Sequence, residues 1–207
     1  MFEPPNAVQL RVSIDEIEPV IWRRIVVPGA WNLAQLHLAI QAAFNWWNYH
    51  LHEFDIGGLR HGDAVIADEG LVEGDPRVFD ERAVRLRDFR PAGLKFTYLY
   101  DFGDGWRHTV EIEEMVVLDS VPNHATCIDG ARARPPEDVG GIPGYERFLE
   151  VIGDPTHPEH KEVKRWCGGH FDPEWFDLAI VDKDVRGALK PNARRRLHQP
   201  KPNKPRA

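Results

Sequence analysis

The sequence contains only two cysteines, Cys127 and Cys167, among its 207 residues. Two thiols are too few for a disulfide scaffold, and they cannot by themselves supply a four-thiolate metal site. No stretch approaches the roughly 20 apolar residues that a membrane-spanning helix needs. The start of the chain also lacks the basic residues and apolar run of a signal peptide. We therefore expect a cytoplasmic protein that has no association with a membrane.

Several enzyme motifs are missing as well: a phosphate-binding P-loop, a dinucleotide-binding glycine pattern and a His-Glu-x-x-His zinc motif. The sequence gives no support to the enzyme classes that use them. It does contain seven Trp, ten Phe and four Tyr, and 42% of its residues are hydrophobic, which is enough for a sizeable core. The length suits one domain with a short extension. We expect a single domain over residues 1–189 and a separate tail over residues 190–207.

The tail is basic and rich in proline. It carries seven positive charges and no acid, at Lys190, Arg194, Arg195, Arg196, Lys201, Lys204 and Arg206. Its four prolines prevent a continuous helix, so we expect the tail to be disordered. Removing its seven charges from the net charge of −7 leaves the rest of the chain at −14, which repels nucleic-acid backbones. The tail is therefore the part suited to a salt-sensitive contact with nucleic acid.

The first part of the chain predicts two neighbouring strands and a helix. Apolar and polar residues alternate over residues 8–14, and a β-rich run follows at 20–27. Asn32 and Gln35 form the pattern of a capping box, after which Leu33, Leu36, His37, Ile40 and Phe44 follow at helical spacing. We expect this helix to pack on the sheet. A third strand is expected at 50–57, a short fourth at 64–67 and an acidic loop at 69–80.

Residues 96–113 predict a β-hairpin. Phe96, Tyr98, Tyr100 and Phe102 alternate before a Gly103-Asp104-Gly105 loop, and Trp106, His108, Val110 and Ile112 alternate after it. We predict a three-residue loop, with Gly105 in the left-handed conformation, because this register puts both apolar sets on one face. It sets Phe102 opposite Trp106 and Tyr100 opposite His108, and it turns Asp101 toward Arg107 on the other face.

The last part predicts a long irregular loop and then helices. Gly and Pro are frequent over residues 122–143. Helices are expected at 145–152, at 158–167 and at 173–189, the last of them capped by Asp172. Strands come early and helices late. This order predicts an α+β fold: a mostly antiparallel sheet with an N-terminal helix packed on it and a C-terminal group of helices.

Three polar groupings could carry chemistry. On a strand, His50 and His52 would point to the same face and could share a metal. The hairpin adds carboxylates and an imidazole that could bind an ion or move a proton, and adjacent carboxylates in the loop beyond it could bind a hard cation. Each grouping also has a plainer interpretation, as strand histidines, turn-forming aspartates or carboxylates at a helix start. The residues of this candidate polar site are His50, His52, Asp101, Asp104, His108, Glu137 and Asp138.

We expect the site where the histidine strand approaches the hairpin, with residues 137–138 at its rim. A divalent metal there has two alternative ligand sets. His50, His52 and His108 would favour zinc or another transition metal, whereas Asp101 and Asp104 would favour magnesium or calcium.

Separated segments of residues 8–189 resemble the plasmid pRiA4b ORF-three-like family, bacterial and archaeal proteins often carried on mobile elements. The matching segments are residues 33–54 with His50-Leu51-His52-Glu53-Phe54, the hairpin at 100–108, Cys127 with Gly130, residues 135–141 with Gly144-Tyr145, and Phe171-Asp172-Pro173. The resemblance implies a compact α+β domain and no established activity. Similar members often have cysteines where this chain has Arg134 and Val139, so a thiolate site does not carry over and a metal here must rest on His, Asp and Glu.

These observations favour a binding or accessory module resembling mobile-element passenger proteins, with an unidentified partner. One alternative is a metal-assisted hydrolase in which the His and Asp residues hold a cation that activates water. A second alternative is a nucleic-acid accessory protein that acts through its basic tail.

Overall fold

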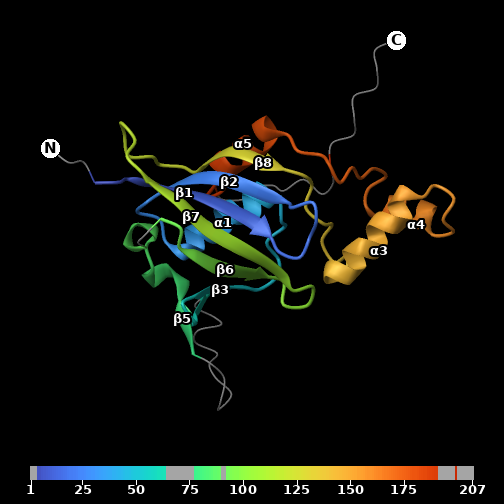
Figure 1. Cartoon of the computed structure of the whole chain (residues 1–207), viewed down its shortest axis with the longest axis horizontal. Helices are drawn as coiled ribbons and strands as arrows, with labels where there is room; N and C mark the ends of the chain where they lie inside the picture. Colours follow the sequence, from blue (N-terminus) through green and yellow to red (C-terminus); the bar gives the residue numbers. More distant parts are fainter. Residues whose placement is uncertain (1–3, 64–76, 90–91, 191–198, 200–207) are drawn as a thin grey trace, which may run out of the picture.

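The computed structural model describes residues 4–63, 77–89, 92–190 and 199. Eight strands of this part form one sheet in the order β5-β4-β3-β6-β7-β1-β2-β8 (Figure 1). Neighbouring strands are antiparallel except β4 and β5, which are parallel. The strands are β1 Ala7–Ile14, β2 Trp22–Pro28, β3 His52–Ile56, β4 Leu59–Gly62, β5 Val78–Asp80, β6 Lys95–Tyr100, β7 Trp106–Val116 and β8 Thr126–Ala131. The predicted mostly antiparallel sheet is confirmed.

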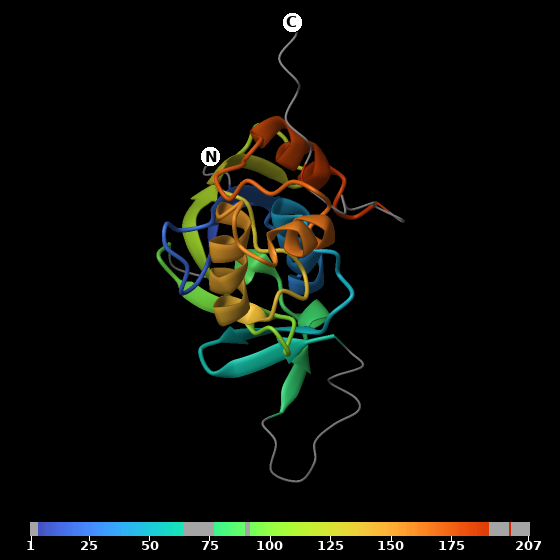
Figure 2. The ribbon, with the colours of Figure 1, turned by 90° about the vertical axis from the view of Figure 1, so that its right-hand side faces the viewer.

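The helices of the described residues are α1 Leu33–Phe44, α3 Gly141–Gly153, α4 His160–Trp166 and α5 Leu178–Arg186. Helix α1 lies against one face of the sheet, and α5 packs on α1 and β8. Figures 1 and 2 show α3 and α4 side by side at one end of the molecule. One helix follows β2, and the other three follow the last strand, so the predicted α+β fold with an N-terminal helix and a C-terminal group of helices is confirmed. None of the described helices has both the length and the apolar character needed to cross a membrane.

The capping box of α1 forms as predicted. Gln35 N donates to Asn32 Oδ1, and Asn32 N donates to Gln35 Oε1, both at 3.0 Å. The apolar face of the helix, including Leu36 and Ile40, is fully buried. The helix ends at Asn45, whose left-handed backbone (φ 59°) turns the chain away from the helix axis. This turn leads directly into residues 46–51, which reach the candidate site.

The hairpin between β6 and β7 has a longer loop than predicted. Tyr100 pairs with Trp106, and Tyr98 pairs with His108. The loop therefore spans residues 101–105. The predicted three-residue loop is wrong, as are the predicted pairings of Trp106 with Phe102 and of His108 with Tyr100.

Local turn chemistry explains the longer loop. Asp101 leaves the strand in the left-handed conformation, with φ 58°, and its Oδ1 accepts the Gly103 N–H at 2.9 Å. Gly105 is left-handed, as predicted, with φ 71°. Phe102 is consequently 44% exposed instead of paired across the hairpin. The expected position of Asp101 opposite Arg107 is also wrong, because Leu99 is the residue paired there.

The shift in register is two residues, which preserves the face of each side chain that stays in a strand, because side chains alternate with a period of two. The prediction that both apolar sets share one face is therefore confirmed for all their members except Phe102, which lies in the loop. The buried residues of this face are Phe96, Tyr98, Tyr100, Trp106, His108, Val110 and Ile112.

Several expected boundaries differ; the helix expected at 145–152, for example, spans Gly141–Gly153. Strand β3 begins only at His52, so His50 lies in the segment before the strand and the two histidines do not share a strand face. The stretch at 122–143 is not irregular throughout, because β8 lies within it and pairs with β2. The last helix begins at Leu178 with Asp177 as its cap, whereas Asp172 closes a turn by accepting the Glu174 N–H.

Two expectations concern the region before β6. The expected strand at 64–67 lies outside the described residues. The expected loop at 69–80 contains strand β5, which pairs with β4. The sequence pattern predicts neither β4 nor β5.

Candidate functional site

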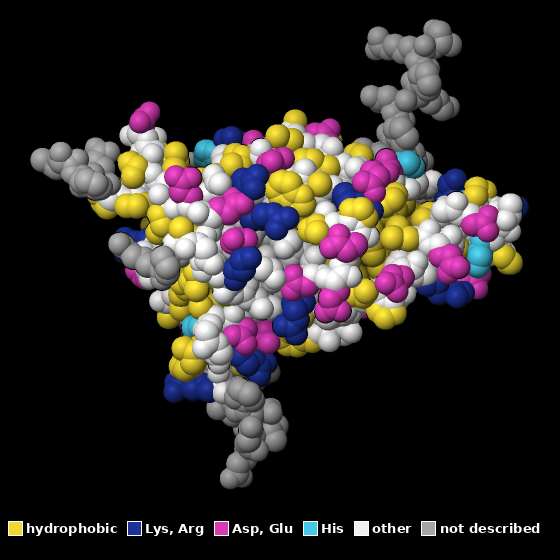
Figure 3. Space-filling view, in the orientation of Figure 1, with side chains coloured by type: hydrophobic (Ala, Val, Ile, Leu, Met, Phe, Trp, Pro, Cys, Tyr) yellow, Lys and Arg dark blue, Asp and Glu magenta, His cyan; other side chains and the backbone are white. Residues whose placement is uncertain are grey.

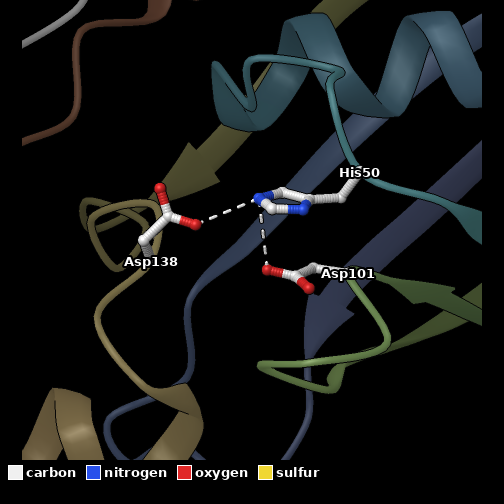
Figure 4. Close-up of side chains that lie close together, drawn as sticks. All are labelled: His50, Asp101 and Asp138. Atoms are coloured by element: carbon white, nitrogen blue, oxygen red, sulfur yellow. Dashed lines mark hydrogen bonds and ion pairs between the residues drawn. The ribbon is translucent and has the colours of Figure 1, made fainter.

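Three side chains from distant parts of the sequence meet at His50. Its Nε2 lies 3.1 Å from Asp138 Oδ1 and 3.4 Å from Asp101 Oδ2 (Figure 4). One ligand atom from each of these residues lies within 4.8 Å of the other two. Among the described residues, this is the one group of three or more His, Cys, Asp or Glu side chains with metal-site spacing. We call it the His50 cluster.

The hairpin loop is fixed to the segment that carries His50. Asp101 N donates to Leu51 O at 2.9 Å, which ties the start of the loop to the residue after His50. Asp101 Oδ1 accepts the loop amides of Gly103 and Asp104, at 2.9 and 3.3 Å. Only Oδ2 is left to face His50. The turn that lengthens the hairpin loop thus also aims a buried carboxylate at the imidazole.

A second pair of contacts fixes the segment that carries Asp138. Trp47 N donates to Glu137 Oε1 at 2.6 Å, and the Tyr49 hydroxyl donates to Asp138 Oδ2 at 2.6 Å. Asp138 Oδ1 faces His50. Trp47 and Tyr49 therefore hold the carboxylates of Glu137 and Asp138 in place.

The same segment also closes against the hairpin loop. Gly140 N donates to Asp104 Oδ2 at 3.1 Å. A Cβ atom at Gly141, whose φ is +67°, would lie only 2.6 Å from the backbone oxygen of Asp104. Glycine is needed for this close approach. Asp104 thus positions the loop around the His50 cluster without contributing an atom to it.

His52 lies in a separate buried network. Its Nε2 is 2.8 Å from Glu81 Oε2, and its ring stacks on that of His37 with centroids 3.5 Å apart. The His52 ring also lies against that of Tyr98 in the core, with centroids 5.9 Å apart. The partner of His52 is therefore Glu81, in the short helical turn that follows β5.

His108 is fully buried and uses both ring nitrogens. Nε2 accepts the Trp46 indole N–H at 3.2 Å, and Nδ1 donates to Trp106 O at 3.0 Å. Burial lowers the pKa of His108 to about 4, so the ring is neutral near pH 7. Neither nitrogen is available to a metal.

The structure therefore brings together His50, Asp101 and Asp138 from the predicted residues, and places Glu137 and Asp104 beside them. It does not bring His50, His52 and His108 together, nor does it aim Asp101 and Asp104 at one point. Tyr49 was missed by the sequence analysis. Its position next to His50 was visible, but nothing in the sequence pairs it with residue 138.

A cavity of about 150 Å³ adjoins the cluster, and Asp138 belongs to both. Arg134, Glu137 and Cys167 also line the cavity. Burial raises the pKa of Glu137, although the Arg134 guanidinium opposes that shift. Burial also lowers the pKa of Arg134 to about 10. A carboxyl of altered acidity in a cleft is typical of functional sites.

Comparison with known proteins identifies the family of this chain. The family described as "Plasmid pRiA4b ORF-3-like protein" matches residues 6–180. A relative from Sinorhizobium fredii, "Uncharacterized protein y4hQ", is 40% identical over 183 residues, which are 87% of this chain and 91% of that protein. The crystal structure of "Protein of Unknown Function MM3350" from Methanosarcina mazei Go1 superposes with a TM-score of 0.72 at 38% identity, covering 88% of this chain and 99% of that one. The chain belongs to the plasmid pRiA4b ORF-3-like family.

Proposed function

We propose that this protein is a binding module that holds a divalent transition-metal ion at the His50 cluster. The observation that carries the proposal is the convergence of one imidazole nitrogen and two carboxylate oxygens within 4.8 Å of one another. The ligands are His50 Nε2, Asp101 Oδ2 and Asp138 Oδ1. Three protein ligands leave coordination positions for water or for a bound partner.

The spacing of these atoms fits a small ion. Ligands bound to zinc at about 2.0–2.1 Å in a tetrahedral arrangement lie roughly 3.3 Å apart. The two distances from His50 Nε2 are 3.1 and 3.4 Å. A mixed set of one imidazole and two carboxylates suits Zn²⁺ or Mn²⁺ better than Mg²⁺ or Ca²⁺, which prefer oxygen ligands alone.

The competing explanation is a protonated His50 that forms ion pairs with both aspartates. The two explanations differ in what they require. An ion pair needs a proton on Nε2, whereas a metal needs a neutral imidazole and therefore displaces that proton. Metal binding should then weaken as the pH falls, because protons compete with the ion for its ligands.

Titration calorimetry of chelator-treated protein with Zn²⁺ and Mn²⁺ tests the proposal. We expect one ion per chain and a higher melting temperature, because an ion that binds only the folded state stabilises it. Asp101→Asn and Asp138→Asn should each weaken binding by at least about tenfold, the scale at which a lost ligand or its support acts. Asp119→Asn, at an exposed aspartate away from the cluster, is the matched control. Equal binding in all four proteins, or no binding in any, would refute the metal proposal.

A second candidate function, metal-assisted hydrolysis, is favoured by Glu137. This carboxyl is 4% exposed, has a raised pKa and directly precedes the proposed ligand Asp138. Such a group can accept or donate a proton while a cation activates water. Metal-dependent turnover of p-nitrophenyl esters or phosphodiesters, lost in Glu137→Gln with metal affinity retained, would support this function. Metal binding with no turnover would leave the binding module.

The described surface gives less support to a nucleic-acid role for the domain. On the face in Figure 3, basic and acidic side chains are interspersed and the basic ones do not form a continuous stripe. A backbone of phosphates needs such a stripe. A nucleic-acid accessory role would therefore have to act through the basic tail.

A further inference from the structure

The cavity beside the His50 cluster has the size of one aromatic ring. Its volume is about 150 Å³, and an apolar cavity of roughly that volume holds one benzene molecule. It is bordered by the end of α1, by residues 133–138, and by α4 and the segment that follows it. Five aromatic residues line it: Phe44, Trp47, Trp166, Phe171 and Trp175. Flat rings on several walls favour a flat ligand.

One polar group of the lining is a hydrogen-bond donor with unused capacity. Arg134 donates from Nη1 to Pro135 O and from Nη2 to Asn45 O. Its guanidinium lies 4.7 Å from the centre of the Trp46 ring. No described residue accepts the Nε–H. A guanidinium fixed in this way offers a directed donor to a ligand.

A second polar group of the lining is the buried carboxyl of Glu137, whose second oxygen has no partner among the described residues. Glu137 Oε1 accepts the Trp47 N–H, whereas Oε2 is shielded from solvent and has no hydrogen-bond partner among the described residues. Buried polar atoms in native proteins are almost always satisfied. Since Glu137 is 4% exposed and lines the cavity, a ligand there is the natural partner of Oε2.

We propose that this cavity binds a single planar heterocycle of pyrimidine size, which presents a carbonyl to Arg134 and an adjacent N–H to Glu137. The neutral free base fits better than a nucleotide, because the domain without its tail has a net charge of −14 and repels a phosphate. The proposal does not depend on a metal at the His50 cluster.

Tryptophan fluorescence of the full-length protein tests the proposal, since three tryptophans line the cavity. Uracil and cytosine are the heterocyclic probes, uridine monophosphate tests the phosphate-bearing form, and benzene is the apolar control. We expect saturable binding of both bases and a weaker response to the nucleotide. Glu137→Gln and Arg134→Lys should each weaken base binding by about tenfold or more, as expected when a site's hydrogen bond is lost, and leave benzene binding unchanged.

The matched control is Glu146→Gln, at an exposed position of α3, which should bind the bases like the wild type. Saturation-transfer NMR of uracil with the unaltered protein provides a measurement that needs no variant. Absence of transfer to the ring protons would overturn the proposal, as would a Glu137→Gln protein that folds and binds uracil with wild-type affinity.

Discussion

Trp106 and Phe102 provide a direct test of the hairpin register that places Asp101 beside His50. Both are aromatic residues at the hairpin end, but Trp106 is fully buried and Phe102 is 44% exposed. The ring of Trp106 stacks on Trp46 with centroids 5.7 Å apart and pairs across the strands with Tyr100. We expect Trp106→Ala to be strongly destabilising and Phe102→Ala to have little effect.

The expected magnitudes differ severalfold. Truncating a fully buried Trp to Ala costs about 3–5 kcal/mol, which includes the cavity that is left behind. In a chain of this length, each kcal/mol lowers the melting temperature by roughly 2–4 °C, so the loss should be about 6–20 °C. Phe102→Ala should cost less than about 1 kcal/mol, because surface substitutions away from special features have small effects.

Urea unfolding followed by circular dichroism measures both free energies of unfolding, and an unchanged m-value shows that the unfolded state is unaltered. A three-residue loop would bury Phe102 opposite Trp106, so comparable losses for the two variants would contradict the five-residue loop. A loss below about 1 kcal/mol for Trp106→Ala would contradict the burial itself.

Three further outcomes are expected. Burial lowers the pKa of His108 to about 4, so between pH 6.5 and pH 4 the unfolded chain binds a proton at this residue that the folded chain does not. The free energy of unfolding should therefore fall by roughly 3 kcal/mol over this range. Unfolding measured as a function of pH should show a smaller fall in His108→Gln. Burial raises the pKa of Glu137, so this residue contributes to the stability of the folded protein at low pH, and the contribution is lost as the pH rises. Melting curves should therefore show Glu137→Gln to be more stable than the wild type near pH 8 but not near pH 4. Truncation after Lys190 removes the two hydrogen bonds between Gln199 and the Asp172 backbone, at 2.8 and 2.9 Å. The free energy of unfolding should fall by less than about 1 kcal/mol. A melting temperature many degrees lower, measured by calorimetry, would instead indicate a packed tail.

The elements with strong local signals could be predicted from the sequence. The α1 helix follows from its capping box and apolar spacing, and the shared face of β6 and β7 follows from alternation alone. The loop between these strands could not be predicted in the same way. Its length depends on Asp101 adopting φ 58° and on its side chain accepting two amides, a choice that apolar alternation does not encode.

The candidate site was predicted only in part for the same physical reason. Residue types identified His50, Asp101 and Asp138 as candidates, but their meeting depends on loops that end one element and approach another. His52 and His108 were grouped with His50 by type, whereas burial directs them to Glu81 and Trp46. Histidines on a core face acquire partners inside the core, and those partners come from distant segments of the sequence.

The backbone around the His50 cluster explains why aspartate suits two of its positions. Six described residues other than glycine have positive φ: Glu16, Asn45, Asn48, Asp101, Arg132 and Asp138. Two of them are carboxylates of the cluster, and Asn48 lies two residues before His50. The left-handed region costs free energy for residues with a side chain, although least for Asn and Asp. Glycine would relieve that cost at positions 101 and 138 but would remove both carboxylates. Aspartate at both positions therefore satisfies the turn while keeping the oxygen atoms that face His50.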